Sequence, residues 1–192
     1  APLPDKLDDF PVEKQQFLDS RGEPLNVSYQ NWFNVFDAVE LYEIPELLQE
    51  MFIAAEDKNF YTHHGIDWGA RLAAVVQNVK AGRVVRGAST LTEQVVRMLH
   101  PRPRTLFSKI VEGADAWRLE RRFSKDDILK FYLNQVPYAS NRRGVKQAAR
   151  YYFSKSPDRL SVRQMAALVV LVRAPAAFNL YKYPEKTDKL VG

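Results

Sequence analysis

Three helix start signals constrain the fold of this chain more than any other feature. Each is a capping box, in which a Ser or Thr is followed three residues later by a side chain that can accept a hydrogen bond from the backbone. The boxes begin at Thr90, Ser124 and Ser161, and apolar residues follow each of them at helical spacing. Because this period differs from the alternation of strands, the pattern predicts a mainly α fold.

Further helices are predicted from apolar stripes between breakers. Pro45 suits a first helical position and is followed by a stripe at residues 48, 51, 52 and 55 that ends near Glu56. A second stripe, at residues 72, 75, 76 and 79, ends at Gly82. After Pro103, we expect a helix that turns four residues inward: Leu106, Ile110, Ala114 and Trp117. A turn signal at residues 19–22 predicts an extended arm that could contain a hairpin.

Length and composition limit the class of protein. A chain of 192 residues is long enough for one ordinary domain without a metal or disulfide to hold it together. The absence of cysteine excludes thiol catalysis and thiolate zinc sites. The net charge of +5 favours an anionic partner, such as nucleic acid, a phospholipid surface or a phosphate-bearing substrate. No apolar run approaches the ~20 residues of a membrane span, and the first residues lack a signal-peptide pattern.

The first candidate for chemistry is the acidic pair Glu56 and Asp57 at the end of a predicted helix. A carboxylate that is partly removed from water there gains proton affinity and can serve as a general base. A solvated surface pair is the alternative interpretation. The neighbouring His63 and His64 do not indicate zinc, because adjacent residues rarely reach one ion and no third ligand follows.

The second candidate is the glycine-flanked basic loop that leads into the helix at Thr90. It presents hydroxyls and free N–H groups at a helix N-terminus, which is a site that binds phosphate. On a later predicted helix, Lys109 and Glu112 share one face. They could neutralise a phosphate and supply a second carboxylate, which could also hold Mg²⁺. The alternatives are an ordinary helix cap and a solvated ion pair.

Taken in order, these segments resemble the family 51 glycosyltransferases, the peptidoglycan polymerases that occur alone or in class A penicillin-binding proteins. The first motif, EDxxFxxHxG, is present from Glu56 to Gly65, and the second, GxSTxTxQ, from Gly87 to Gln94. Lys109 and Glu112 match the third motif, RKxxE. The fourth, KxxILxxYLN, runs from Lys125 to Asn134, and the fifth, RGxxxAA, begins at Arg143. The segments around the second and third motifs look most like the C-type bifunctional enzymes.

This resemblance implies a lysozyme-like helical lobe with a smaller jaw subdomain that faces the membrane. We expect a glycosyltransferase domain over residues 45–192 with its jaw at about residues 66–108, and an extended arm or linker over residues 1–44. The implied partners are lipid II, a lipid-linked nascent glycan, the membrane surface and other cell-wall synthesis proteins. The implied location is the extracytoplasmic face of the bacterial inner membrane, with an anchor outside these residues.

The resemblance also implies roles for individual residues. Glu56 and Glu112 would be catalytic, and Glu112 would also be the ligand of any Mg²⁺; no organic cofactor is implied. Substrate-binding roles are implied for twelve residues: Asp57, Phe60, His63, Gly87, Ser89, Thr90, Thr92, Gln94, Arg97, Lys109, Asn134 and Arg143. We also expect Arg71 and the loop at Val84 and Val85 to face lipid head groups.

Three positions depart from the family pattern. Ser108 stands where the third motif has arginine, Arg97 occupies a usual lysine position, and Glu93 replaces a commoner glutamine or methionine. The departures at Ser108 and Glu93 motivate the main alternative, a weakly active or inactive module that binds lipid II or acts as a scaffold. A lytic transglycosylase is a further alternative, although it would not need a basic diphosphate site. Nucleic-acid binding is rejected, because only the net charge supports it.

Overall fold

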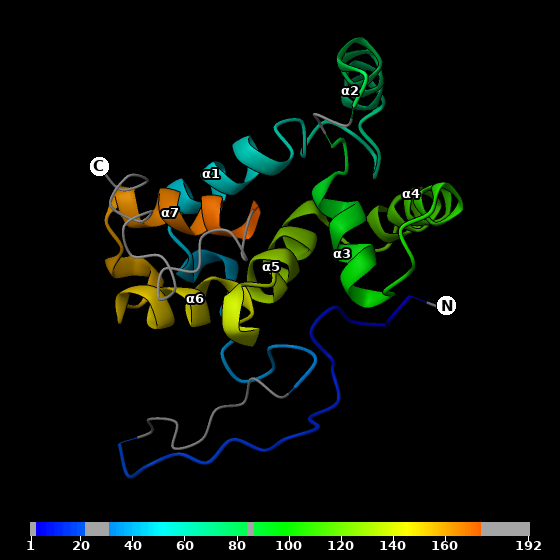
Figure 1. Cartoon of the computed structure of the whole chain (residues 1–192). Coiled ribbons are helices and arrows are strands. Elements are labelled where there is room, and N and C mark those ends of the chain that lie inside the picture. Colours follow the sequence, from blue (N-terminus) through cyan, green and yellow to red (C-terminus); the bar gives the residue numbers. More distant parts are fainter. Residues whose placement is uncertain (1–2, 22–30, 84–86, 174–192) are drawn as a thin grey trace. The chain divides into compact units, whose positions relative to one another are not determined.

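Every regular element in the described part of the computed structural model, residues 3–21, 31–83 and 87–173, is a helix (Figure 1). The mainly α fold predicted from the sequence is therefore confirmed. Three short 3₁₀ helices lie at Leu41–Glu43, Ala139–Asn141 and Pro157–Arg159. The α-helices are α1 (Glu46–Glu56), α2 (Trp68–Ala81), α3 (Leu91–Leu99), α4 (Leu106–Glu120), α5 (Lys125–Gln135), α6 (Gly144–Phe153) and α7 (Val162–Arg173).

All three predicted capping boxes are confirmed. At the start of α3, the Glu93 N–H donates to Thr90 Oγ1 at 3.2 Å and the Thr90 N–H donates to the Glu93 carboxylate at 3.0 Å. Reciprocal bonds of the same kind join Ser124 to Asp127 at α5, and Ser161 to Gln164 at α7. The predicted helix ends at Glu56 and Gly82 are also confirmed.

Two compact units make up the chain, and their boundaries fall within α1 and α5. The first consists mainly of residues 53–129 and contains α2, α3 and α4. Within it, α3 packs against α4 (Figure 1). Leu91 and Val95 are fully buried, as predicted from their spacing. This pairing brings the second and third sequence motifs together.

The second unit consists of residues 4–52 and 130–192, and contains α6 and α7. Part of the predicted N-terminal arm is held on α5 in this unit by polar contacts. The Val39 N–H donates to Asn134 Oδ1, and Asn134 Nδ2 donates back to the Val39 carbonyl, both at 2.8 Å. The Asn34 N–H donates to Gln135 Oε1 at 2.8 Å. Of the turn predicted at residues 19–22, the first three residues are described, and there the Arg21 N–H donates to Asp19 Oδ1 at 2.8 Å. Gly22 and the segment that would complete a hairpin lie outside the described residues, and the arm boundary at residue 44 stays a prediction.

The prediction for the inward face of α4 is wrong. Leu106 is 86% exposed and Ile110 is 70% exposed, while Ala114 and Trp117 also face outward. The buried side of α4 carries polar groups instead, including Ser108, Glu112 and Asp115. The spacing of apolar residues predicts the wrong buried face for this helix. The polar groups on its buried side pair with residues that tertiary packing brings close.

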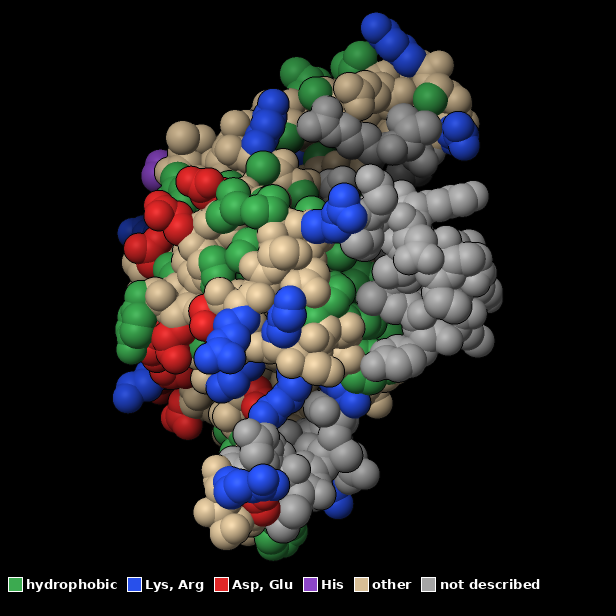
Figure 2. Space-filling model, turned by 90° about the vertical axis from the view of Figure 1, so that its left-hand side faces the viewer, with side chains coloured by type: hydrophobic (Ala, Val, Ile, Leu, Met, Phe, Trp, Pro, Cys, Tyr) green, Lys and Arg blue, Asp and Glu red, His purple; other side chains and the backbone are tan. Residues whose placement is uncertain are grey.

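The apolar stripe predicted on α2 is also exposed. Leu72 is 67% exposed and Val79 is 76% exposed, and Figure 2 shows hydrophobic side chains on the outside of α2, at the top of the view. Only Ala74 of this helix is buried. Two helices of the first unit thus present apolar faces outward. No helix in the described ranges is both long enough and apolar enough to cross a membrane.

Candidate active site

Glu56, the predicted base, is the last residue of α1 and is half-buried. Its carboxylate oxygen Oε2 accepts a hydrogen bond from Gln94 Nε2 of α3 at 3.2 Å. Both residues were predicted as site residues, from motifs that lie far apart in the sequence. The packing of the first unit therefore joins the carboxylate to the second motif.

Asp57 connects the first motif to the start of α3. Its side chain is 3% exposed, and Oδ2 accepts from the Leu91 N–H at 2.9 Å and contacts His63 Nε2 at 2.9 Å. Thr90 Oγ1 donates to the Gly65 carbonyl at 2.7 Å. These bonds fix the loop of the first motif against a helix N-terminus. Asp57 and Thr90 thus have internal partners and hold the site in shape.

A lysine from α4 lies beside the second motif. Lys109 Nζ donates to Ser89 Oγ at 2.8 Å. Ser89 lies just before the N-cap of α3, so a cation and a helix N-terminus are brought together there. Gly87 in the same loop is exposed, and Arg86 lies outside the described residues. The arrangement is suited to an anionic group, because cations and helix N-termini both favour negative charge.

Arg97 and Glu112 form a two-pronged ion pair between α3 and α4. Arg97 Nε donates to Glu112 Oε1 at 3.1 Å, and Nη2 donates to Oε2 at 2.8 Å. The hydrogen bonds to Glu112 raise the pKa of Arg97 above its ordinary value. The Glu112 side chain is 6% exposed, whereas that of Arg97 is 35% exposed. Glu112 therefore orients a cation that still reaches the surface.

Mg²⁺ at Glu112 stays a prediction, and the residues present fit it poorly. Both carboxylate oxygens already accept hydrogen bonds from Arg97. In residues 3–21, 31–83 and 87–173, no three His, Cys, Asp or Glu residues lie together in a way that could hold a metal ion. Mg²⁺ needs carboxylate and other oxygen ligands at short range. No step below is assigned to a metal ion.

Several of the other predicted substrate-binding residues are buried and bonded within the protein. Phe60 and Thr92 are fully buried, and Thr92 Oγ1 donates to Glu120 at 2.5 Å. In the second unit, Asn134 is 4% exposed and uses its amide to bind Val39 and the Lys130 carbonyl. The structure therefore gives these three residues packing contacts.

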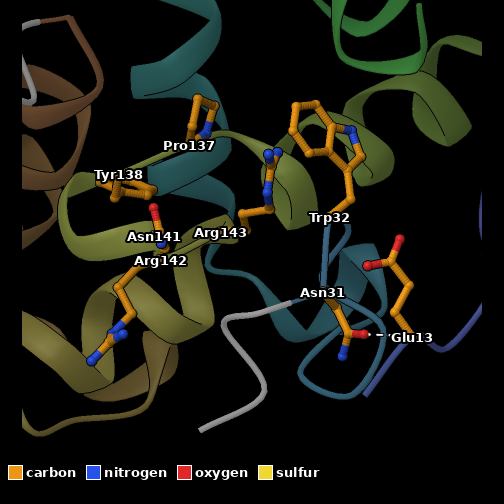
Figure 3. A pocket seen from close by; sticks show the side chains of 8 residues that line it. All are labelled: Glu13, Asn31, Trp32, Pro137, Tyr138, Asn141, Arg142 and Arg143. Carbon is orange, nitrogen blue, oxygen red and sulfur yellow. Dashed lines mark hydrogen bonds between the residues drawn. The ribbon is translucent and has the colours of Figure 1, made fainter. Parts of the chain in front are cut away.

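Arg143, also a predicted substrate-binding residue, lines a separate hollow in the second unit. This cavity has a volume of about 570 Å³ and is shown in Figure 3. The Arg143 guanidinium lies 5.1 Å from the centre of the Trp32 ring, and burial lowers the pKa of Arg143. The remaining lining residues are Glu13, Asn31, Pro137, Tyr138, Asn141 and Arg142.

The departures from the family pattern have specific partners. Glu93 accepts from the Thr90 N–H in the α3 capping box and pairs with Arg71, so its carboxylate has internal partners. The expectation that Arg71 faces lipid head groups stays a prediction. The Ser108 N–H donates to Oγ1 of Thr105, the α4 N-cap, at 3.0 Å, and the two hydroxyls share a second hydrogen bond at 2.9 Å. Arg102, upstream of it, is held by Asp115 at 2.7 Å. Val84 and Val85 lie outside the described residues.

Two partly buried residues in this unit have contacts that sequence reasoning missed. Lys125 was recognised only as part of a motif, and Glu120 not at all. Lys125 Nζ donates to Glu120 Oε1 at 2.7 Å and lies 3.5 Å from His63 Nδ1. No helical spacing connects these residues, because Glu120 ends α4 and Lys125 begins α5. In the sequence, the signal for this cluster was Lys125 itself, the lysine with which the fourth motif begins.

Comparison with known proteins decides the family. A family model described as Transglycosylase matches residues 26–191. The chain belongs to this transglycosylase family. The family resemblance deduced from the sequence motifs is confirmed, whereas its narrower C-type likeness stays a prediction.

Curated relatives of this transglycosylase chain include three penicillin-binding proteins. It is 42% identical over 149 residues to penicillin-binding protein 1A of Aquifex aeolicus, covering 77% of this chain and 20% of the relative. The identity to penicillin-binding protein 1F of Bacillus subtilis is 38% over 154 residues, covering 80% of this chain and 22% of the relative. For penicillin-binding protein 1A of Escherichia coli it is 40% over 142 residues, covering 73% and 17%. The chain thus spans about a fifth of the length of these relatives.

Proposed function

We propose that this chain is a peptidoglycan glycosyltransferase that polymerises lipid II into β-1,4-linked glycan. One observation supports this most strongly: α3 connects a carboxylate to two cations. Its Gln94 contacts Glu56, and its Arg97 is held by Glu112. Ser89, just before this helix, binds Lys109. A base and an anion-binding site in one unit are what transfer from a diphosphate-linked sugar requires.

In the proposed reaction, Glu56 takes the proton from the 4-hydroxyl of the acceptor sugar. That oxygen forms a bond to the anomeric carbon of the lipid-linked donor. The bond from this carbon to the phosphate oxygen breaks, and its electron pair leaves with undecaprenyl diphosphate from the opposite face. One base is enough, because a single displacement inverts the anomeric carbon without a covalent intermediate.

The charge on the leaving diphosphate must be neutralised rather than protonated. Lys109 is suited to this role, because within the described part of the chain its ammonium donates to a neutral hydroxyl, that of Ser89, rather than to a carboxylate. Arg97 is held for the same purpose by Glu112, which leaves its guanidinium partly exposed. The resulting roles are Glu56 as base, Lys109 and Arg97 as anion ligands, and Glu112 as the residue that positions Arg97.

The membrane surface is the second proposed partner. On α2, the residues exposed by more than two fifths include Trp68, Leu72, Val75, Val76 and Val79, which share one helix face. On α4, Leu106, Phe107 and Ile110 are exposed by at least 70%. Exposed apolar residues on neighbouring turns are typical of interfacial helices. This supports a location at the extracytoplasmic face of the bacterial membrane, where lipid II is polymerised.

The test is polymerisation of fluorescent lipid II in detergent. The chain should make glycan ladders, and Glu56→Gln should slow polymerisation at least about 100-fold, because a carboxamide cannot accept the proton. Glu50→Gln changes an exposed carboxylate on the same helix and should leave the rate unchanged. Equal rates for Glu56→Gln and the unsubstituted chain would reject the proposed base.

The scaffold alternative makes a different prediction in the same assay. A module that only binds lipid II would retain the labelled substrate on a gel-filtration column and make no ladder. The conversion of Glu56 to glutamine would then leave binding unchanged. That pair of results would replace the polymerase with the scaffold.

A further inference from the structure

A chain of largely buried titratable residues leads to the segment that carries the proposed base. It begins at Lys125 and Glu120, passes through His63, and ends at Asp57, next to Glu56 in the sequence. The side chains of Asp57, Glu120 and His63 are only 3%, 6% and 7% exposed. Carboxylates this deeply buried are costly unless they are paired and bonded. The arrangement therefore calls for a specific role.

The hydrogen-bonding inventory determines where the proton of His63 resides. An ionised Asp57 can only accept, so His63 Nε2, at 2.9 Å, must donate to it. An ammonium can only donate, and Lys125 Nζ lies 3.5 Å from Nδ1. This contact favours an unprotonated Nδ1, and with it the neutral imidazole that carries its single proton on Nε2.

Glu120 has the opposite preference. Its Oε1 lies 3.8 Å from His63 Nδ1, and its Oε2 is buried without a hydrogen-bond partner in the described part of the chain. Without Lys125, this carboxylate would favour a second proton, on Nδ1. Asp67, before α2, also interacts with His63 electrostatically. Among the described residues, Lys125 is thus a cation that opposes three carboxylates around one imidazole: Asp57, Asp67 and Glu120.

The network reaches the base through α3. Asp57 Oδ2, which receives the His63 proton donor, also accepts the Leu91 N–H at the start of this helix. One turn later on the same helix, Gln94 donates to Glu56. Lys125 Nζ also lies over the Phe60 ring of the first motif, 4.5 Å from the ring centre, in a cation–π contact. A change in the charge of His63 would act directly on the segment that carries Glu56.

We infer that Lys125 is a positioning residue for the glycosyl transfer. It acts by keeping His63 neutral, so that the Nε2–H of His63 donates to Asp57. The inference rests on the proposed function. A protonated His63 would place a cation beside Asp57 and alter the contacts that fix the loop of the first motif on α3. The network therefore holds the segment that carries Glu56 in one arrangement. Lys125 and Glu120 touch no reacting atom in this scheme.

The first experiment follows the imidazole directly. The chain contains three histidines, so the ¹⁵N signals of His63 can be assigned by their loss in His63→Gln. At neutral pH, Nε2 should carry a proton and Nδ1 should not. In Lys125→Met both nitrogens should be protonated, and in Lys125→Arg only Nε2. An unprotonated Nδ1 in Lys125→Met would overturn the inference, even if the chain had no polymerase activity.

The second experiment measures the polymerisation rate as a function of pH. In Lys125→Met, kcat should fall on the order of tenfold at neutral pH with KM little changed, and the loss should be smaller near about pH 9, where an imidazole holds a second proton less readily. Lys125→Arg should restore the rate. A loss of equal size at both pH values would indicate a purely structural lysine and overturn the inference.

A double substitution separates charge from packing. Adding Glu120→Gln to Lys125→Met removes the carboxylate that attracts the second proton, so the neutral-pH rate should rise relative to Lys125→Met alone. Loss of packing would instead make the double variant slower still. Lys130→Met breaks an exposed lysine–glutamate pair on the same helix and serves as the control, with an unchanged pH profile. Failure of the unsubstituted chain to polymerise would count against the proposed function alone.

Discussion

Arg97 and Glu112 form two parallel hydrogen bonds, of 3.1 Å and 2.8 Å, across the α3–α4 contact. The pair joins the second sequence motif to the third. Because a bidentate arginine–carboxylate pair fixes orientation as well as distance, it sets the direction in which the exposed edge of Arg97 points. The arginine that replaces the usual lysine here makes use of a geometry that lysine lacks.

Removing the Glu112 charge should release Arg97. For Glu112→Gln, we expect a free energy of unfolding lower by about 2 kcal/mol and a polymerisation rate lower by at least about tenfold. Urea unfolding and lipid II polymerisation measure the two effects. Glu40→Gln, in the exposed pair with Lys130, should change the free energy of unfolding by less than about 1 kcal/mol. Similar losses in both variants would show that Glu112 has no special role.

Gly65 should be irreplaceable, because it combines a left-handed backbone with a close helix contact. Its φ is 81°, and an added Cβ would lie 2.7 Å from the backbone nitrogen of Trp117. Gly82 has a φ of 63°, but no atom of the described residues lies within 4 Å of such a Cβ. Gly82→Ala should cost only the left-handed strain, about 1–2 kcal/mol. Gly65→Ala should cost clearly more in thermal unfolding, and equal costs would contradict the packing argument.

Asp67 should make the stability of α2 depend on acid pH. Its carboxylate caps α2, and the hydrogen bond from the Ala70 N–H lowers the pKa of Asp67 below its ordinary value. A lowered folded-state pKa means that the stabilisation is present above the unfolded value, about 3.9, and is lost as pH falls through the folded one. Asp67→Asn keeps a capping side chain but cannot ionise.

Thermal unfolding between neutral and strongly acidic pH checks this. The unsubstituted chain should lose more stability on acidification than Asp67→Asn does. Asp67→Ala should be less stable than either at neutral pH by about 1 kcal/mol, since the cap is removed. Parallel pH curves for the first two chains would contradict a role for the ionised carboxylate.

The exposed face of α2 should bind membranes. Replacing Val75 and Val79 with lysine or aspartate should have different outcomes, because lysine retains attraction to anionic lipid whereas aspartate repels it. We expect Val75→Asp with Val79→Asp to reduce flotation with phosphatidylglycerol vesicles severalfold without changing the melting temperature. Val162→Asp changes an exposed valine of α7 and should leave flotation unchanged. Unchanged flotation of the α2 double variant would reject the membrane face.

Local signals predicted the helices well, because capping and helix termination depend on neighbours in the chain. The boxes at Thr90, Ser124 and Ser161 and the stop at Gly82 all lie where expected. The motif order also predicted that Glu56 and Gln94 belong to one site. The distance between Gln94 Nε2 and Glu56 Oε2 is 3.2 Å, at the long end of the range for a side-chain hydrogen bond.

The buried faces of α2 and α4 could not be read in the same way. Apolar periodicity shows that a helix has one apolar and one polar face. It does not show which of the two faces packs against the rest of the protein. On α4, Leu106 and Ile110 face outward, while Glu112 is buried because α3 supplies Arg97. Burial of a charge depends on a partner, and partners from distant segments leave no trace in local spacing.

The sequence by itself determined the helical class, the helix starts and the set of residues that carry the chemistry, because propensity, capping and motif identity are local properties. Only the tertiary structure decided which of those residues meet. The pairing of Glu120 with Lys125 around His63 arises where the end of one helix and the start of the next approach the loop of the first motif. Hydrogen bonds and charge act through space, so their partners are set by packing rather than by position along the chain.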